Sequence, residues 1–315
     1  MTSYDACGLL VGHATDVEGA TGCTVVRGVD GPFRAAVHVI GRATGTRELA
    51  LLDPGQLVDR VDAILLAGGS AYGLDAAAGV MRWMEERGRG FPVGAGVVPI
   101  VPAAVVFDLA PLGRFDARPT PGSGHAACEA AVATPSEGSI GAGTGATVGK
   151  VAGAAHSMKG GCGIGAADAD DVVVRALAVV NAFGDVRDAS GHIVAGARDG
   201  EGRWLDTAAQ VTRDAGQATR FDALAGRNTT LCVVSTNVAL DRVQLASLAR
   251  AASAALFRRI TPVGTPYDGD VVFATAPCAD GISASPIQVE ALAVRALEVA
   301  IERAVRTRIA GEILS

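Results

Sequence analysis

An asparagine and two threonines, Asn228-Thr229-Thr230, stand where a polar, glycine-containing segment runs into an apolar stretch. As a surface motif, this triplet is an acceptor for N-glycosylation. As chemistry, it places the Thr229 hydroxyl directly after a peptide bond that the hydroxyl could attack. A threonine nucleophile needs a base, and none of the histidines lies in a motif that would supply one.

Cleavage of the Asn228–Thr229 bond would itself provide the base, because it exposes an α-amine on the nucleophile. The unperturbed pKa of such an amine is about 7.7–8.0, against about 10.4 for a lysine side chain. Near pH 7.5, roughly a third of these amines are neutral and can accept a proton. The threonine must also begin a rigid strand, so that its hydroxyl and amine are held at a sheet edge facing a pocket.

An acidic pair lies further along the chain, where Asp268 and Asp270 flank Gly269 at the start of a predicted strand over residues 269–276. If the segment is extended, both carboxylates project to the same side of it. Such a pair could hold an ammonium group or orient a hydroxyl. A turn capped by one aspartate is the alternative interpretation of the same residues.

The glycine-rich segment Gly141–Lys150 suggests a nucleotide site but fails the tests for one. A Walker phosphate loop requires Ser or Thr after the lysine, where this chain has Val151, and Thr144 occupies the position of the earlier glycine. A dinucleotide fingerprint is matched only in part. Close backbone packing is the simpler interpretation, and a non-catalytic nucleotide-binding protein stays an alternative. Lys150 keeps its interest, because a lysine that ends a glycine run is often held near an anion.

The segment Gly68–Gly79 is similar to a nucleophile elbow, a strand–turn–helix arrangement that exposes a serine. The elbow requires a glycine two residues after Ser70, and this chain has Tyr72 there. We therefore expect a glycine-rich turn without a nucleophile.

The bulk properties are typical of a compact globular protein of 315 residues. Hydrophobic residues make up 49% of the chain and 41 residues are glycine, which favours tight packing over disorder. The net charge of −6 and the scattered basic residues argue against nucleic-acid binding. The six cysteines form no C-x-x-C pair and the histidines are dispersed, so we expect no metal site.

We expect a cytoplasmic protein with no membrane partner. The N-terminal segment has no basic region before its short apolar run, unlike a signal peptide. No stretch reaches the roughly 18 uncharged apolar residues of a membrane helix. A cytoplasmic location disfavours the glycosylation of Asn228.

Strand and helix patterns are mixed without a regular βαβ repeat, which predicts an α/β protein with helix-covered sheets in a single domain, residues 1–315. Strands are expected over residues 23–29, 34–41, 63–69, 103–109, 172–188, 192–198 and 229–237. Helices are expected over residues 74–87, 124–134, 241–257 and 287–309.

Taken together, these segments resemble the DmpA-type aminopeptidase family, in order and over nearly the whole chain. The resemblance rests on AGRNTTLCVVSTNVALDRVQL followed by PYDGDVVFA, with EGATGCTVV, LAGGSAYGLDAAAG, AAVVFDL, GAGTGATVGK and VVNAFGDV in support. That family includes L-aminopeptidase/D-esterases, β-peptidyl aminopeptidases and endo-type 6-aminohexanoate (nylon) oligomer hydrolases.

The resemblance implies an α-β-β-α sandwich of the N-terminal-nucleophile hydrolase type, self-cleaved into an α chain (1–228) and a β chain (229–315). It implies hydrolysis of short peptides or oligoamides through an acyl-enzyme, without a metal or organic cofactor. It also implies a homo-oligomer, a tetramer of αβ units. Nylon-oligomer endohydrolysis as the main activity is the alternative, and ornithine acetyltransferase chemistry on a similar fold matches these motifs much less well.

Residue by residue, the resemblance implies that Thr229 is the nucleophile, exposed by cleavage after Asn228. Asp268 and Asp270 match the pair that holds the nucleophile and its amine. The Asn-Thr junction followed by two aspartates is closer to the nylon-hydrolase branch than to the β-peptidyl and D-esterase enzymes, which have a Gly-Ser junction.

Asn181 matches an asparagine that donates to the oxyanion, and Lys150 matches an active-site lysine that helps self-cleavage or charge balance. One departure concerns Phe107, which stands where the family has an oxyanion-donating tyrosine. A phenyl ring cannot donate a hydrogen bond, and the loss of one such donor can cost about 3–4 kcal/mol of transition-state stabilisation. Tyr72 and the backbone N–H groups of its glycine-rich turn are the candidates to replace that donor.

Overall fold

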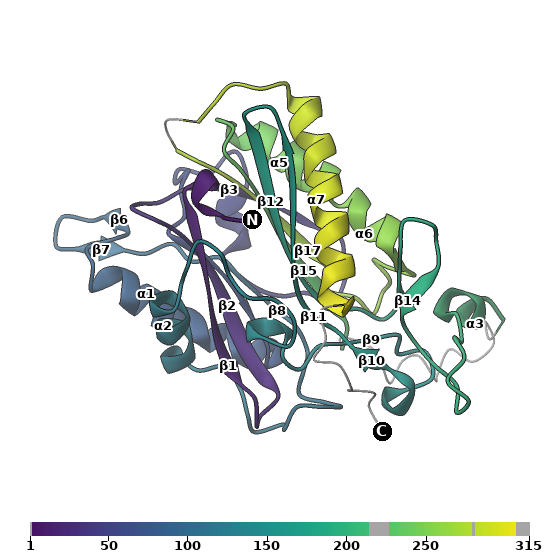
Figure 1. Ribbon diagram of the computed structural model, residues 1–315. Coiled ribbons are helices and arrows are strands. Elements are labelled where there is room, and N and C mark those ends of the chain that lie inside the picture. Colours follow the sequence, from purple (N-terminus) through teal and green to yellow (C-terminus); the bar gives the residue numbers. More distant parts are fainter. Residues whose placement is uncertain (1, 214–226, 279–280, 307–315) are drawn as a thin grey trace.

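A computed structural model describes residues 2–213, 227–278 and 281–306 of the chain (Figure 1). These residues form four layers, with two β-sheets face to face and helices on both outer sides. The predicted α/β class and α-β-β-α sandwich are therefore confirmed. Gly226, and residues 307–309 of the predicted C-terminal helix, lie outside the described residues.

The first sheet has the strand order β1–β2–β5–β8–β4, and its neighbours are antiparallel except for β5 and β8. Two helices cover its outer face, α1 (Ala76–Glu85) and α2 (Pro121–Glu129). The strands are β1 (Leu9–Asp16), β2 (Thr21–Gly28), β4 (Gly45–Arg47), β5 (Ala63–Ala67) and β8 (Ala103–Val105).

The second sheet has the order β11–β12–β15–β17–β3, and its neighbours are antiparallel except for β15 and β17. Its outer face packs against α5 (Arg242–Ala252), α6 (Ala254–Arg259) and α7 (Pro286–Arg306). The strands are β3 (Arg34–Val39), β11 (Gly161–Ala169), β12 (Val172–Asn181), β15 (Thr229–Thr236) and β17 (Val271–Ala276).

Shorter elements connect and flank the two sheets. The helix α3 (Thr207–Arg213) is among them, and a 3-10 turn, Ser70–Asp75, precedes α1. The short strands are β6 (Phe91–Pro92), β7 (Val97–Val98), β9 (Thr147–Val148), β10 (Met158–Lys159), β13 (Asp185–Arg187), β14 (Ile193–Ala195) and β16 (Ile260–Thr261).

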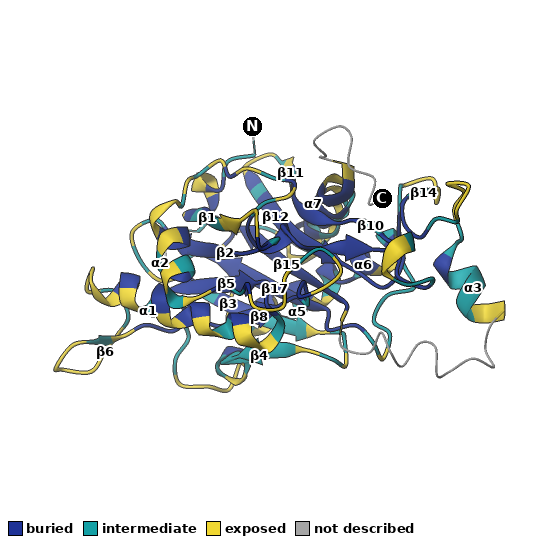
Figure 2. Ribbon diagram, turned by 90° about the horizontal axis from the view of Figure 1, so that it is seen from below, coloured by how far each residue is buried: buried dark blue, intermediate teal, exposed yellow. Residues whose placement is uncertain are grey.

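The strands of the second sheet are apolar on both faces because they separate two cores. On β15, Leu231 and Val233 belong to the core between the sheets, whereas Cys232 and Val234 belong to the core under the helices. Successive side chains of a strand face opposite sides, so one continuous apolar run serves both cores. Figure 2 shows the sheets buried and the exposed residues gathered on the outer helices and loops.

Strand β11 is glycine-rich because α7 lies directly on it. A Cβ atom at its alternate glycines would come within 1.9 to 2.5 Å of backbone oxygens of α7. Glycine is unfavourable in strands, which is why the sequence pattern did not predict β11. The glycines are Gly161, Gly163 and Gly165, and they lie against Ala304, Ala300 and Ala296 respectively.

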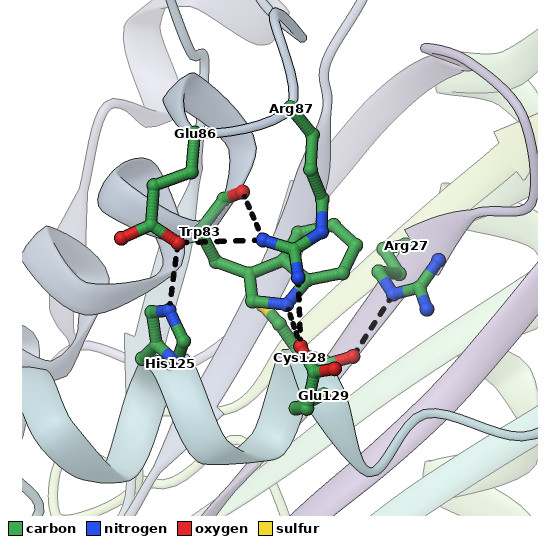
Figure 3. Close-up of polar contacts among 7 residues, drawn as sticks. All are labelled: Arg27, Trp83, Glu86, Arg87, His125, Cys128 and Glu129. Carbon is green, nitrogen blue, oxygen red and sulfur yellow. Dashed lines mark hydrogen bonds and ion pairs between the residues drawn. The ribbon is translucent and has the colours of Figure 1, made fainter.

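Trp83 ties α1 to α2 on the outer side of the first sheet (Figure 3). Its indole N–H donates to the Glu129 carboxylate at 2.5 Å. The guanidinium groups of Arg27 and Arg87 lie over its ring, 4.4 and 4.0 Å from the centroid, and Arg87 also pairs with Glu129 at 3.0 Å. Such cation–π contacts fix the two helices against each other and against β2.

Several element boundaries differ from those predicted. The strand predicted over 103–109 ends at Val105, which places Phe107 in the following loop. The strand predicted over 172–188 is two strands, β12 and β13, and the helix predicted over 241–257 is divided at Ser253. Strand β17 begins at Val271, so Asp268 and Asp270 lie in the turn before it and not within it.

Two general expectations can be compared with the fold. Within the described ranges, none of the helices combines the length and the apolar character that crossing a membrane requires. Five of the six cysteines are buried, as expected for small apolar side chains, and Cys278 is partly exposed.

Candidate active site

The predicted site residues Thr229, Asn181, Asp268 and Asp270 meet at one end of the second sheet. Asn181 is the last residue of β12 and is paired in register with Thr229, the first residue of β15. Because β15 and β17 run parallel, the turn that carries the two aspartates lies at this same end. Lys150, just after β9, completes the group through its contacts with Asn181.

Thr229 is placed directly against the bond that precedes it. Its hydroxyl Oγ1 donates to the carbonyl oxygen of Asn228 at 2.5 Å, and the backbone N–H of Gly269 donates to the same oxygen at 2.8 Å. Asn228 and Thr229 are both buried, at 0% and 4% exposure, so Asn228 is not an accessible glycosylation acceptor. The arrangement polarises the Asn228 carbonyl and brings a hydroxyl to it.

Gly269 owes its place in the site to its missing side chain. A Cβ atom at this position would lie 2.8 Å from Thr229 Oγ1 and 2.6 Å from the carbonyl oxygen of Ala43. Gly269 was not predicted as a site residue, because a backbone N–H leaves no signature of residue type. The only signal was its position between Asp268 and Asp270.

Lys150 and Asn181 form a buried pair whose groups are held by backbone atoms. Lys150 Nζ donates to Asn181 Oδ1 at 2.9 Å, to the Asn181 carbonyl at 3.0 Å and to the Arg227 carbonyl at 3.2 Å. Asn181 Oδ1 also accepts from the backbone N–H of Thr147 at 3.0 Å. Asn181 Nδ2 donates to the carbonyls of Phe107 at 3.0 Å and Arg227 at 3.2 Å.

Each aspartate joins the segment 264–265 to a residue near one of the paired strand ends, Phe183 for Asp268 and Thr230 for Asp270. Asp268 accepts from the Thr265 hydroxyl at 2.6 Å and from the Thr265 backbone N–H at 3.0 Å. Asp270 accepts from the backbone N–H of Thr230 at 2.6 Å and of Gly264 at 3.1 Å. Asp270 therefore holds the second residue of β15, and so fixes the strand end on which Thr229 lies.

Burial shifts the protonation of these groups toward neutrality. Desolvation lowers the pKa of Lys150 to about 7, although the nearby Asp268 and Asp270 act in the opposite direction. Desolvation and the neighbouring Asp268 raise the pKa of Asp270 to about 7, and burial also raises the pKa of Asp268. Groups that gain and lose protons near pH 7 are suited to general acid–base catalysis.

Phe107 lies at the edge of this group and contacts it through its backbone carbonyl and the face of its ring. Its carbonyl accepts from Asn181 Nδ2, and the guanidinium carbon of Arg227 lies 5.6 Å from the centroid of its ring. A small cavity of about 50 Å³ lies beside Lys150 and Arg227, and its wall also includes Thr147 and Pro111.

Tyr72, the predicted replacement donor, is placed elsewhere. The residue is 54% exposed, the guanidinium carbon of Arg118 lies 3.7 Å from the centroid of its ring, and the ring packs edge-on against Phe115. It lines a separate cavity together with Arg47 and Asp116. The Asn228 carbonyl instead accepts from Gly269 and Thr229, and the Arg227 carbonyl accepts from Asn181 and Lys150.

The segment Gly141–Lys150 is buried throughout, which explains its glycines by packing. A Cβ atom at Gly143 would lie 2.3 Å from the backbone nitrogen of Cys162, and one at Gly145 would lie 2.2 Å from the Ala20 carbonyl oxygen. The segment is therefore not a phosphate cradle open to solvent. This corrects the alternative interpretation of the chain as a nucleotide-binding protein.

The comparison with known families supplies the assignment. A profile of peptidase family S58 matches residues 4–310. The chain belongs to this family. An uncharacterised aminopeptidase of Mycobacterium tuberculosis is 41% identical over 293 residues, which cover 86% of this chain and 80% of the relative. A 6-aminohexanoate-oligomer endohydrolase of Agromyces sp. is 32% identical over 311 residues, covering 94% of this chain and 82% of that protein.

Solved structures of similar fold support the assignment of the fold. The L-aminopeptidase D-Ala-esterase/amidase of Ochrobactrum anthropi, described as a variant of the Ntn hydrolase fold, matches with a TM-score of 0.71. The two chains are 20% identical, over 96% of this chain and 85% of the other. A β-aminopeptidase of Burkholderia sp. matches with a TM-score of 0.68 and 19% identity, over 96% of this chain and 86% of the other. The S58 member described here thus has an Ntn hydrolase fold and is an amide-bond hydrolase.

Proposed function

We propose that this S58 protein is a self-processing hydrolase whose nucleophile is an N-terminal threonine, Thr229. One observation carries the proposal: the Thr229 hydroxyl and the Gly269 N–H both donate to the Asn228 carbonyl oxygen, at 2.5 and 2.8 Å. A nucleophile and a donor for the oxyanion therefore converge on the bond that must break.

Self-cleavage begins with attack of Thr229 Oγ1 on the carbonyl carbon of Asn228. The negative charge that develops on the carbonyl oxygen is stabilised by the Gly269 N–H. The C–N bond between the residues breaks, an ester to Oγ1 remains, and the hydroxyl proton passes to the new α-amine. Water then hydrolyses the ester and leaves two chains, residues 1–228 and 229–315.

Lys150 and Asp270 are the groups whose pKa suits proton transfer in this step. Both have a pKa of about 7, because burial disfavours the charged form of each. A neutral Lys150 accepts a proton, while a protonated Lys150 balances the charge of the aspartates. Asp268 and Asp270 hold the turn that presents Gly269 and the start of β15.

In the cleaved enzyme, the α-amine of Thr229 takes the hydroxyl proton while Oγ1 attacks the substrate amide carbonyl. The Gly269 N–H is the proposed donor to the oxyanion, as in self-cleavage. Asn181 Nδ2 donates to the Phe107 and Arg227 carbonyls, so we assign it to the acyl side of the substrate in place of the oxyanion role that the resemblance implies. The leaving amine receives the proton, and water releases the acyl group from Oγ1. Each step uses groups of this chain, with the amine serving as base in place of a histidine.

We propose short peptides or oligoamides as substrates, supported by the names of an aminopeptidase and of a 6-aminohexanoate-oligomer endohydrolase among the relatives. The assembly of αβ units into a tetramer and a cytoplasmic location also remain proposals. Sedimentation of the purified protein and fractionation of cells that produce it test these two points.

The function is tested by following cleavage and activity together in one sample. Newly translated chain is sampled over time, its mass is measured, and hydrolysis of an aminoacyl p-nitroanilide is recorded. We expect hydrolysis to appear in proportion to the fragments 1–228 and 229–315. Full hydrolytic activity from a chain that stays whole would contradict the proposal.

A further inference from the structure

The ester formed in self-cleavage is chemically an acyl-enzyme whose acyl group is the chain's own segment ending in Arg227-Asn228. In this ester, the carbonyl carbon of Asn228 is bonded to Thr229 Oγ1, as the carbonyl carbon of a substrate later is. The same pocket walls surround both acyl groups. Under the proposed function, the contacts of Arg227 and Asn228 therefore mark where the acyl side of a substrate binds.

The carbonyl of Arg227 is surrounded by donors. Lys150 Nζ and Asn181 Nδ2 both donate to it at 3.2 Å, and both side chains are buried. Each donor is anchored by a second contact, Lys150 on Asn181 Oδ1 at 2.9 Å and Asn181 on the Phe107 carbonyl at 3.0 Å. A position built from donors stabilises a carbonyl oxygen and disfavours an ammonium group.

A substrate with a free α-amine lacks this carbonyl. Its ammonium would occupy the position of the Asn228 backbone nitrogen. In the uncleaved chain this nitrogen is bonded to the Arg227 carbonyl carbon, whose oxygen accepts from Lys150 and Asn181. The two donors would then lose their acceptor, and a protonated Lys150 would lie close to a like charge. Buried donors left without an acceptor oppose binding.

The side chain of Arg227 indicates a second preference. Its guanidinium carbon lies 5.6 Å from the centroid of the Phe107 ring, within the range of cation–π attraction. Phe107 is the residue at which this chain lacks the tyrosine expected from the family resemblance. Its ring has no hydroxyl to donate, but its face is available to a cation.

The side chain of Asn228 is also recognised. Its Nδ2 donates to the carbonyl oxygen of Tyr267 at 3.3 Å, in the turn that precedes Asp268. This carbonyl favours a side chain that can donate a hydrogen bond, as the amide of asparagine does. An asparagine residue is therefore a suitable acyl residue for probing the site.

We propose that the acyl side of the site recognises an α-peptide whose amine is blocked: Lys150 and Asn181 bind the carbonyl one residue upstream, and Phe107 favours a cationic side chain on that residue. The chain is then an endo-acting hydrolase of α-amides, with Phe107 as a specificity-determining residue. The spacing matters, because one Cα and one nitrogen separate the two carbonyls of an α-peptide. A long ω-amino acid separates them by several methylene groups, and its upstream carbonyl would not reach the same donors.

The blocked-amine preference is tested with a matched pair of substrates. The self-cleaved enzyme, verified by intact mass, is given acetyl-asparaginyl p-nitroanilide and asparaginyl p-nitroanilide at pH 7. We expect kcat/KM to be at least about tenfold higher for the acetylated substrate, because only it supplies the carbonyl acceptor. An equal or higher kcat/KM for the free amine overturns the proposal, as does failure of the cleaved enzyme to hydrolyse any acetylated substrate.

The role of Phe107 is tested with acetyl-arginyl-asparaginyl and acetyl-norleucyl-asparaginyl p-nitroanilides, which differ in the charge of the upstream side chain. We expect the wild type to prefer arginine by roughly three- to tenfold, and Phe107→Leu to reduce this ratio to about one. Phe115→Leu, which removes a ring from the Arg118 stack instead, should keep the wild-type ratio. A ratio near one in the wild type, or an unchanged ratio in Phe107→Leu, contradicts the assignment.

These outcomes separate the proposal from the function on which it rests. A self-cleaved enzyme that hydrolyses free-amine substrates best retains the proposed function and loses only the specificity inferred here. A chain that neither cleaves itself nor hydrolyses any of these amides loses both.

Discussion

The hydroxyl of Thr229 lies 2.5 Å from the carbonyl oxygen of Asn228, its neighbour in sequence. The backbone of this junction is fixed on both sides, since Asn228 forms a parallel bridge with Asp268 and Thr229 pairs with Asn181 across two strands. A hydroxyl held this close to one peptide bond needs little movement to attack it, which favours intramolecular reaction.

Substitution of Thr229 tests whether self-cleavage depends on its hydroxyl group. We expect Thr229→Ala to remain one chain of 315 residues and Thr229→Ser to yield the fragments 1–228 and 229–315. Serine keeps the hydroxyl but lacks the branched carbon that limits rotation, so its cleavage should be slower by roughly three- to tenfold. Denaturing gels and intact mass measure both results. Cleavage of Thr229→Ala at this bond would show that another group performs the attack.

Substitution of Gly269 tests whether self-cleavage depends on the exact position of the Thr229 hydroxyl. A methyl group at Gly269 would lie 2.8 Å from Thr229 Oγ1, so Gly269→Ala must displace either the hydroxyl or the turn. We expect self-cleavage to slow by at least roughly 100-fold, because attack depends on sub-ångström placement of the reacting atoms. The rate is measured on pulse-labelled chain from cell-free translation.

Gly55→Ala is the matched control, since a Cβ atom at Gly55 meets nothing within 4 Å. It should cleave at the wild-type rate. Wild-type cleavage by Gly269→Ala, with its near-ultraviolet circular dichroism unchanged, would remove Gly269 from the proposed mechanism.

The rates of self-cleavage and substrate turnover should depend on the amide group of Asn181. In Asn181→Asp, the group that donates to the carbonyls of Phe107 and Arg227 becomes an acceptor facing two acceptors. We expect self-cleavage and turnover of an acetylated p-nitroanilide to fall by about 10²-fold, because repulsion at the Arg227 carbonyl displaces the acyl group next to the scissile bond. Both are measured as initial rates.

Asn237→Asp provides the control for that exchange. Asn237 also accepts from a backbone N–H, that of Val173, and donates to a carbonyl, that of Asp171, but at the other end of β15. It should lose stability while keeping its rate of self-cleavage. Equal losses of rate in the two variants would mean that Asn181 has only a structural role.

The sequence predicted most of the strands but not all of them. The apolar runs predicted most strands, because a strand buried on both faces is continuously hydrophobic, as in β15. The glycines of β11 concealed a strand, because their use depends on α7, which comes more than a hundred residues later in the chain. Long-range contacts of this kind leave no local pattern.

The candidate site shows the same division. Thr229, Asn181 and Lys150 were identified by residue type and resemblance, and the fold brings them together. The N–H of Gly269 and the carbonyl of Arg227 were not identified, because every residue type has such groups and only the fold decides which of them meet. The prediction for Tyr72 was wrong. Its hydroxyl made it a candidate donor at the site, but the fold places the side chain beside Arg118, in a separate cavity.

The acidity of Asp270 predicts how the stability of the uncleaved chain depends on pH. Burial and Asp268 raise its pKa from 3.8 to about 7, so between these values the folded chain keeps a proton that the unfolded chain has lost. Its contribution is fully present below about pH 4 and is lost as the pH rises through about 7. We therefore compare Thr229→Ala with Thr229→Ala/Asp270→Asn, neither of which cleaves itself. The free energy of unfolding should fall between pH 4.5 and 6.5 by roughly 1–2 kcal/mol less in the double variant.

Urea unfolding at each pH measures this difference. Loss of one hydrogen bond to Thr230 or Gly264 adds an offset that does not vary with pH, so parallel slopes for the two proteins would contradict a buried, protonated Asp270.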